Sequence, residues 1–265
     1  MSVDDQDRQK LLDRLFYGWG RDVAVAGAFL TRLPFRPGGD VAMSDLGPAS
    51  RAFPLIGLLV GVFAGGALWL GAKAALHPLA CGFIGLTVSA WITGALHEDG
   101  LADFVDGIGA RTRERRLEIM RDSHIGTFGV LALVFSVGAK AALLAGFLGP
   151  GLAATALIAA VTISRAPIAV IMWRQAPARK DGLGRDAGQP TSADATIAMA
   201  LAALCAVSLL GWAVGGLAVM MALCAAGMVA WLARKRLGGY TGDVLGAAQQ
   251  AAEIAVLLAA GAYAI

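Results

Sequence analysis

Long apolar stretches alternate with short polar connections along most of the chain. Seven of them approach the ~20 apolar residues that a helix needs to cross the core of a bilayer, at about 52–76, 79–97, 125–149, 151–173, 195–214, 216–233 and 244–265. Tryptophans lie near several of the expected helix ends, as is typical of anchors at a membrane surface: Trp69, Trp173, Trp212 and Trp231. The pattern predicts an all-α fold, a polytopic transmembrane helical bundle with about seven spanning helices.

The N-terminal part of the chain has a different pattern. Between residues 9 and 21, apolar and charged side chains fall on opposite faces of a helix, which is typical of a helix lying in the membrane interface. Residues 23–35 form an apolar piece that is too short to span, so it could be re-entrant or pack against the bundle. We therefore predict one integral-membrane domain over 1–265, with an N-terminal interfacial segment (1–51) and a helical bundle (52–265).

Composition and charge agree with a membrane protein. Of the 265 residues, 57% are hydrophobic and 15% charged, where a soluble domain would carry about a quarter charged residues. The net charge of +3 is too small to suggest nucleic-acid binding. Lys and Arg gather in residues 1–51 and in the connections 98–124, 174–194 and 234–243, while the alternate connections contain none. This bias predicts a multi-pass protein of the cytoplasmic (inner) membrane, with its polar loops and active site on the cytoplasmic face.

An acidic row follows the second apolar stretch. The segment HEDGLADFVDG starts at His97 and spaces Asp99, Asp103 and Asp106 four and three residues apart, on one helical face. Clustered carboxylates repel one another unless a cation lies among them, and hard oxygen ligands favour Mg²⁺ over zinc. Asp243 opens the last helix on the same expected face. We predict a Mg²⁺ site formed by these four aspartates; the alternative is a solvated loop with acidic residues grouped by chance.

Arginines and further polar residues surround this row. Arginine suits phosphate binding because its paired N–H donors match phosphate oxygens, so Arg111 and Arg121 are substrate candidates. Arg113 and Arg115 instead fit a role in setting topology. Asp122 precedes the next apolar stretch, where it either caps that helix or adds a carboxylate to the metal site.

Two basic residues are expected within apolar stretches. An unpaired Arg165 would be costly inside a membrane, so it should pair with a substrate phosphate or with a structural partner such as Glu253. Lys140 is expected toward the outer side, with its amine reaching the interface.

Several segments, in order along the chain, resemble the cobalamin synthase family. They are LHEDGLADFVDG, RRLEIMRDSHIGTFGVLAL and GGYTGDVLGAA, supported by FLTRLPF, AFPLIGLLVG, SRAP and PARKDGLG. The similarity extends over nearly the whole chain. The acidic row also resembles the carboxylate motif of CDP-alcohol phosphotransferases, but it lacks the spacing of that motif.

The resemblance implies a Mg²⁺-dependent ribazoletransferase of cobalamin biosynthesis. Adenosylcobinamide-GDP and α-ribazole (or its 5′-phosphate) would give adenosylcobalamin (or its 5′-phosphate) and GMP. A ribazole hydroxyl would attack the phosphorus attached to cobinamide, and Asp106, or else His97, would take its proton. The substrate-binding candidates are Arg32, Arg111, Arg121, Asp122, Ser123, His124, Arg165 and Thr241.

Other partners and functions stay open. Membrane lipid is an expected partner, and the glycine stripe Gly57, Gly61 and Gly65 is compatible with packing within one chain or in a homo-oligomer. The alternative functions are a CDP-alcohol phosphotransferase-like enzyme and a secondary transporter. A transporter would place ionisable groups near the middle of the membrane, whereas here the acidic residues gather toward one face.

Overall fold

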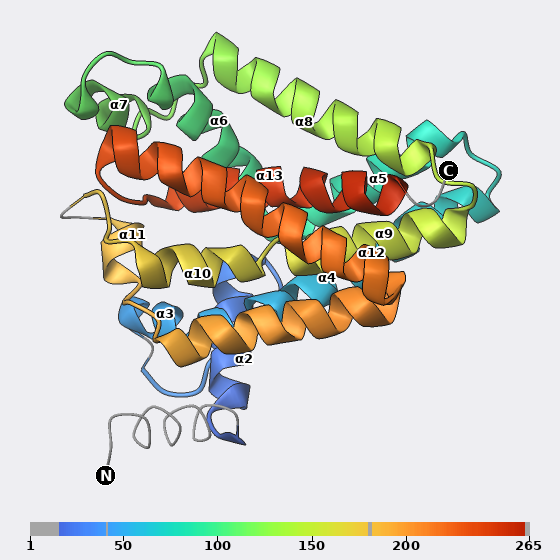
Figure 1. Cartoon of the computed structure of the whole chain (residues 1–265), viewed down its shortest axis with the longest axis horizontal. Coiled ribbons are helices and arrows are strands. Elements are labelled where there is room, and N and C mark those ends of the chain that lie inside the picture. Colours follow the sequence, from blue (N-terminus) through green and yellow to red (C-terminus); the bar gives the residue numbers. More distant parts are fainter. Residues whose placement is uncertain (1–15, 41, 180–181, 263–265) are drawn as a thin grey trace.

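The computed structural model describes residues 16–40, 42–179 and 182–262 (Figure 1). Its α-helices are α2 (Trp19–Leu30), α3 (Leu46–Ala49), α4 (Phe53–Lys73), α5 (Pro78–Thr93), α6 (Leu96–Ile108), α7 (Arg113–Ile119), α8 (Thr127–Ala145), α9 (Pro150–Ile163), α10 (Ala166–Arg174), α11 (Leu183–Asp186), α12 (Ser192–Leu237) and α13 (Gly242–Gly261). Two short 3-10 helices, η1 (Met43–Asp45) and η2 (Ser50–Ala52), flank α3. Within these ranges there is no β-strand, only an isolated bridge between Pro177 and Tyr240. The all-α prediction is confirmed.

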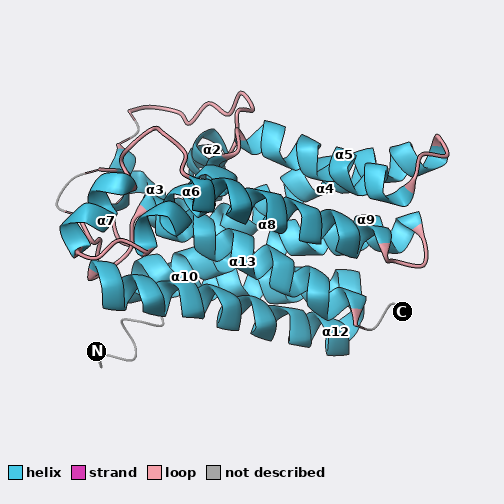
Figure 2. Ribbon diagram, turned by 90° about the horizontal axis from the view of Figure 1, so that it is seen from above, coloured by secondary structure: helices cyan, strands magenta, loops and turns pink. Residues whose placement is uncertain are grey.

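The long helices lie side by side along the molecule (Figures 1 and 2). The last helix, α13, occupies the middle of the bundle, where it packs against α12, α6, α9 and α8 and buries most of its residues. Alanine and glycine make up much of the core, so neighbouring backbones approach closely, as is common for helices in membranes. The helices α6, α7 and α11 lie at one end of the bundle, which we call the charged end.

Five segments within the described ranges are long and apolar enough to cross a membrane: Met43–Lys73, Thr127–Ala145, Pro150–Arg174, Ser192–Leu237 and Gly242–Gly261. The bent pair α5 and α6 would add a sixth if it counts as one span. The expected spans 195–214 and 216–233 both lie within Ser192–Leu237, which is counted here as one segment although it consists of two helical arms. Gly211 interrupts α12 with non-helical angles (φ 76°, ψ 165°), and the chain reverses there (Figure 1).

The predicted span 79–97 is also different in the structure. Helix α5 ends at Thr93, and the next two residues, Gly94 and Ala95, both adopt left-handed angles. Left-handed geometry is unfavourable for alanine because of its Cβ, so a bend at this point is not evident from the residue types. The two helices meet at 91°. Helix α6 therefore turns away from α5 and carries the acidic row at the charged end, outside the five spanning segments.

The glycine stripe on α4 packs within the chain. A Cβ at Gly57, Gly61 or Gly65 would meet the backbone of α9 at 2.7–3.0 Å, so only glycine allows this approach. The predicted interfacial helix over 9–21 lies mostly outside the described residues. Most of the expected apolar piece 23–35 belongs to α2. This helix packs against α3 and α4, in agreement with the alternative in which the piece packs against the bundle.

Candidate active site

Two helices bring acidic side chains together at the charged end. Helix α6 crosses α13 where Gly100 faces Gly246: a Cβ on Gly100 would lie 3.2 Å from the Cα of Asp243, and a Cβ on Gly246 would lie 3.1 Å from the Cα of Gly100. This close crossing places Asp99, in the first turn of α6, beside the first turn of α13. Asp99 and Asp243 line one and the same cavity.

The four predicted aspartates influence one another, and we call Asp99, Asp103, Asp106 and Asp243 the carboxylate cluster. The pKa of Asp103 is raised to about 6, mainly by burial and then by the negative charges of Asp99, Asp243 and Asp106, while Arg179 acts in the opposite direction. Such crowding of negative charge favours a bound cation.

The donor chemistry of the cluster fits Mg²⁺, because all four side chains offer hard oxygen atoms. Among the residues that the structure describes, however, no three acidic, histidine or cysteine side chains are close enough to hold a metal ion as they stand. The metal role of the cluster therefore stays a prediction.

Asp106 has a structural task that the sequence did not reveal. Its Oδ2 accepts a hydrogen bond from the backbone N–H of Gly126 (2.7 Å), and its Oδ1 accepts one from Gly129 (2.8 Å). Asp106 thus satisfies backbone donors at the N-terminus of α8, which otherwise lack partners within the helix. Because both oxygens are engaged, Asp106 is less suited to take a proton than the sequence suggested.

Asp122 does not cap α8, which was one of its two expected roles. Its Oδ1 instead accepts from the backbone N–H of His124 (3.1 Å) and contacts the ring Nδ1 of His124 (2.6 Å). This contact lowers the pKa of Asp122 and raises the pKa of His124. Asp122, Ser123 and His124 all lie on an exposed loop.

Thr241 holds one member of the cluster in place. Its hydroxyl oxygen accepts from the backbone N–H of Val244 (3.3 Å) and so caps α13. The same hydroxyl donates to Oδ2 of Asp243 (3.0 Å). Thr241 is buried, and its contacts make it a positioning residue for Asp243.

The structure adds Arg179, which the charge pattern identified only as part of the basic connection 174–194. Arg179 lies 3.8 Å from Oδ2 of Asp243 and donates to the backbone carbonyl of Leu117 (2.9 Å). It also lines a cavity of about 410 Å³ together with Arg113 and Arg121. We call this space the basic cavity; its other lining residues are Glu114, Leu117, Glu118 and Ala178. The PARKDGLG segment was the only sequence signal that could have pointed to Arg179.

The arginines that follow the acidic row divide differently from the prediction. Arg121 lines the basic cavity, and Arg111 is exposed. Arg113, expected only to set topology, donates to the carbonyls of Leu237 and Ala178, so it fastens α7 to the end of α12 and to the loop after α10.

A second cavity opens on Asp99 and Asp243. Its volume is about 150 Å³, and its polar lining consists of His97, Asp99 and Asp243. We call it the apolar cavity because most of its wall is hydrophobic: Phe29, Leu30, Leu46, Phe53, Leu96, Ile168, Met172, Ala187 and Leu245. His97 is buried, and its Nε2 has no hydrogen-bond partner among the described residues.

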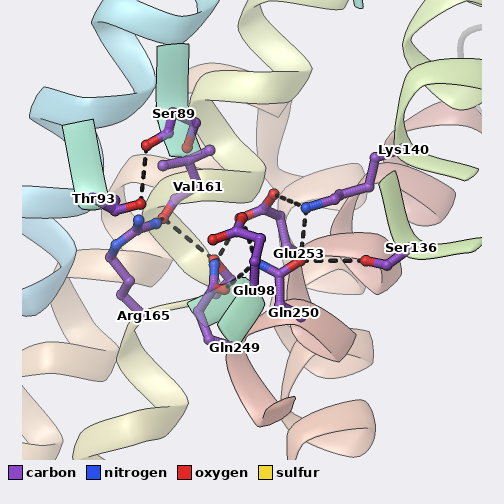
Figure 3. Close-up of polar contacts among 11 residues, drawn as sticks. Ser89, Thr93, Glu98, Ser136, Lys140, Val161, Arg165, Gln249, Gln250 and Glu253 are labelled. Atoms are coloured by element: carbon purple, nitrogen blue, oxygen red, sulfur yellow. Dashed lines mark hydrogen bonds and ion pairs between the residues drawn. The ribbon is translucent and has the colours of Figure 1, made fainter. Parts of the chain in front are cut away.

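Two of the predicted arginines lie away from the cluster. Arg32 is exposed and its side chain covers Gly94, so it lies over the bend between α5 and α6. Arg165 is buried in the core, where it donates to the carbonyl of Val161 (Figure 3). Glu253 and Glu98 are the acidic side chains that act on Arg165 electrostatically, in agreement with the structural alternative.

The expectation for Lys140 was wrong. Its amine does not reach an interface but is buried, donating to Oε1 of Gln250 (2.7 Å) and Oε1 of Glu253 (3.0 Å) (Figure 3). Gln250 also donates to Oε1 of Glu98 (3.0 Å) on α6. Three helices therefore share one buried polar network, which a hydropathy pattern cannot reveal because the partners are far apart in sequence.

Fold and site together define a polytopic α-helical membrane protein with an acidic site at one end of its bundle. Residues 22–261 match the family described as Cobalamin-5-phosphate synthase. The chain belongs to this family and is an enzyme of cobalamin synthesis.

Relatives of this chain carry one enzyme name, adenosylcobinamide-GDP ribazoletransferase. The protein of that name from Bradyrhizobium diazoefficiens is 41% identical over 243 residues, which cover 91% of this chain and 94% of the relative. One from Rhizobium etli (strain CIAT 652) is 43% identical, covering 90% and 95%. One from Azorhizobium caulinodans is 43% identical, covering 92% and 96%. No solved structure matches the chain.

Proposed function

We propose that this chain is a Mg²⁺-dependent transferase that joins adenosylcobinamide-GDP and α-ribazole, or its 5′-phosphate, to give adenosylcobalamin, or its 5′-phosphate, and GMP. The observation that carries the proposal is the carboxylate cluster together with the two cavities beside it. Arg179 lies near Asp243 and lines the basic cavity, and the apolar cavity opens on Asp99 and Asp243. The names of the relatives supply the two substrates.

In the proposed reaction the carboxylate cluster would bind the metal ion, and the arginines would bind phosphate groups. Asp99 and Asp243 would hold Mg²⁺, which neutralises charge on the diphosphate when bound, and Asp103 beside them would stay free to exchange a proton. Arg179 and Arg121 would bind the phosphates of the guanylate that departs, because guanidinium groups match phosphate oxygens. Phosphoryl transfer depends mainly on such positioning and charge neutralisation.

Asp103 is a better candidate than Asp106 for the group that accepts the hydroxyl proton. A catalytic base works best with a pKa near the working pH, and in the metal-free protein burial and the neighbouring carboxylates raise the pKa of Asp103 to about 6. Asp106 already accepts two backbone hydrogen bonds. The proposed site lies on the cytoplasmic face of the inner membrane, where positive-inside bias puts the basic loops.

The direct test uses the purified full-length protein in detergent or lipid nanodiscs. With adenosylcobinamide-GDP, α-ribazole and Mg²⁺, we expect equal amounts of GMP and coupled corrinoid, and no product without Mg²⁺. Release of CMP from a CDP-linked alcohol, with no GMP, would instead identify the phosphotransferase alternative. Solute accumulation in proteoliposomes without GMP release would identify the transporter.

Arg179 provides a sharper test of the site itself. Arg179→Gln should lower kcat/KM about 10²-fold or more, in the range for losing a donor to developing phosphate charge. Arg115→Gln is the matched control, because Arg115 is exposed and forms an ion pair with Glu118 on its own helix (2.8 Å). Equal loss in the two variants would exclude a specific role for Arg179.

A further inference from the structure

The proposed reaction brings two substrates together at the carboxylate cluster. Two different cavities lie close to this cluster: Asp99 and Asp243 line the apolar cavity, and Arg179, near Asp243, lines the basic cavity. The acceptor hydroxyl must reach the phosphorus at the carboxylate cluster, so the rest of the acceptor has to occupy a space that opens on those aspartates. The basic cavity suits phosphates because arginines line it. The apolar cavity opens directly on Asp99 and Asp243 and has no basic side chain in its wall other than the buried His97.

The wall of the apolar cavity selects an uncharged, aromatic occupant. Phe29, Phe53, Ile168 and Met172 contribute to this wall. A charged group placed there would lose its hydration without gaining a partner. An apolar cavity of about 150 Å³ is large enough for a benzene ring, and this one has the same volume and an open polar rim.

His97 gives the cavity a polar group that could fix the orientation of a ring. The side chain lines the cavity, is 3% exposed, and leaves its Nε2 without a hydrogen-bond partner among the described residues. Buried polar atoms are normally paired, so an unpaired ring nitrogen in a cavity wall indicates a partner supplied by a ligand.

We propose that the apolar cavity binds the base of the acceptor nucleoside, with His97 Nε2 donating a hydrogen bond to a ring nitrogen of that base. The proposal rests on the proposed function. It assigns the ribose hydroxyls of the acceptor to the rim formed by Asp99 and Asp243, next to the proposed proton acceptor Asp103, which lies one turn from Asp99 on α6. α-Ribazole, a benzimidazole riboside, has the required apolar bicyclic base with one free ring nitrogen.

A pair of substitutions on one helix tests the position of the base. Ile168→Phe would fill the cavity, because Ile168 lines it. Ile171→Phe is the matched control, since Ile171 lies one turn further along α10, is equally buried and is not part of the cavity wall. We expect Ile168→Phe to raise KM for α-ribazole about tenfold or more and to leave KM for adenosylcobinamide-GDP unchanged. The same change in both variants would overturn the proposal.

An enlarged cavity gives a readout that a folding defect cannot produce. Ile168→Ala should improve the use of a riboside with a tricyclic aromatic base relative to α-ribazole, measured as the ratio of the two kcat/KM values. His97→Gln, which keeps an N–H donor, should retain more affinity for α-ribazole in equilibrium dialysis than His97→Leu. An unchanged ratio together with equal affinities would overturn the proposal.

These outcomes separate the inference from the proposed function. Failure of the wild-type protein to release GMP would refute the proposed function. Full wild-type turnover, with Ile168 and Ile171 variants that cannot be distinguished, would refute only the assignment of the cavity.

Discussion

Asp103 carries a charge that the folded protein disfavours without a cation. Its raised pKa, about 6, means that the folded state binds the proton more tightly than the unfolded chain, where the value is near 3.8. Without metal, the contribution of Asp103 to stability therefore falls as the pH rises from about 4 to about 6, and stays unfavourable above that. Function and stability oppose each other at this residue, which is common where charges are gathered for catalysis.

Asp103→Asn should therefore stabilise the metal-free protein while removing its activity. At pH 8 in EDTA we expect a melting temperature a few degrees above that of the wild type, because one repelled charge is gone. Thermal unfolding with and without Mg²⁺ measures this, and Mg²⁺ should stabilise the wild type more than the variant. Asp122→Asn is the control: the pKa of Asp122 is lowered rather than raised, so this change should not increase stability. Full turnover by Asp103→Asn would contradict the proposed role.

Thr241 should affect catalysis through Asp243. Thr241→Val removes both the cap of α13 and the bond to the carboxylate, whereas Thr241→Ser keeps the hydroxyl. Loss of a helix cap costs about 1 kcal/mol, which thermal unfolding would detect. We further expect Thr241→Val to need more Mg²⁺ for half-maximal turnover, and Thr241→Ser to match the wild type. A change in stability alone, with the Mg²⁺ requirement unaltered, would limit Thr241 to capping.

Residue spacing predicted which side chains gather but not what each one does. The four- and three-residue spacing places Asp99, Asp103 and Asp106 on one face of α6. In the structure the charges of Asp99 and Asp106 contribute to the raised pKa of Asp103. The sequence could not show that Asp106 binds the start of α8, because that contact depends on how the connection between the helices folds. It missed Arg179 for the same reason, since its partner Asp243 is far away along the chain.

At the scale of elements, α4 and α9 depend on the absence of side chains between them. A Cβ on Gly61 would lie 3.0 Å from the Cα and the carbonyl oxygen of Ile158, whereas a Cβ on Gly66 would meet nothing within 4 Å. We expect Gly61→Ala to destabilise the protein by about 1–3 kcal/mol, as overpacking does. Gly66→Ala should be neutral or stabilising by about 0.5–1 kcal/mol, because alanine is favoured in a helix. Unfolding in one detergent compares the two, and equal effects would refute the close contact.

Element boundaries were predictable where hydrophobicity changes and not where the backbone turns inside an apolar stretch. The ends of α4, α8 and α13 follow the loss of apolar residues. The bend after α5 lies within the predicted span 79–97, and one of its two left-handed residues is Ala95. The reversal at Gly211 is also surrounded by apolar residues, and it lies a few residues before the connection expected between 214 and 216. Both turns depend on backbone angles that hydropathy does not record.

At the scale of the whole molecule, a neutral polar network joins the site to the centre of the bundle. Lys140 on α8 and Arg165 beside α9 supply positive charges, and Glu253 on α13 and Glu98 on α6 supply negative ones (Figure 3). The bond from Gln250 to Glu98 connects α13 to the first turn of α6, directly before Asp99. The network thus fixes how the two helices that carry the cluster lie against each other. Composition predicted a bundle, but only tertiary contacts could place these charges.

Breaking one charge pair of this network should cost far more than neutralising both partners. Lys140→Met leaves the buried carboxylate of Glu253 without its ammonium partner, which typically destabilises a protein by about 3–5 kcal/mol. The double variant Lys140→Met with Glu253→Gln should recover much of that loss, since Glu98 and Arg165 still balance each other. A double-mutant cycle from thermal unfolding gives the coupling energy. Lys73→Met, at an exposed lysine near the end of α4, controls for losing a lysine and should change little. Simple additivity in the cycle would mean that Lys140 and Glu253 act independently, which would contradict the pairing of these two charges in the network.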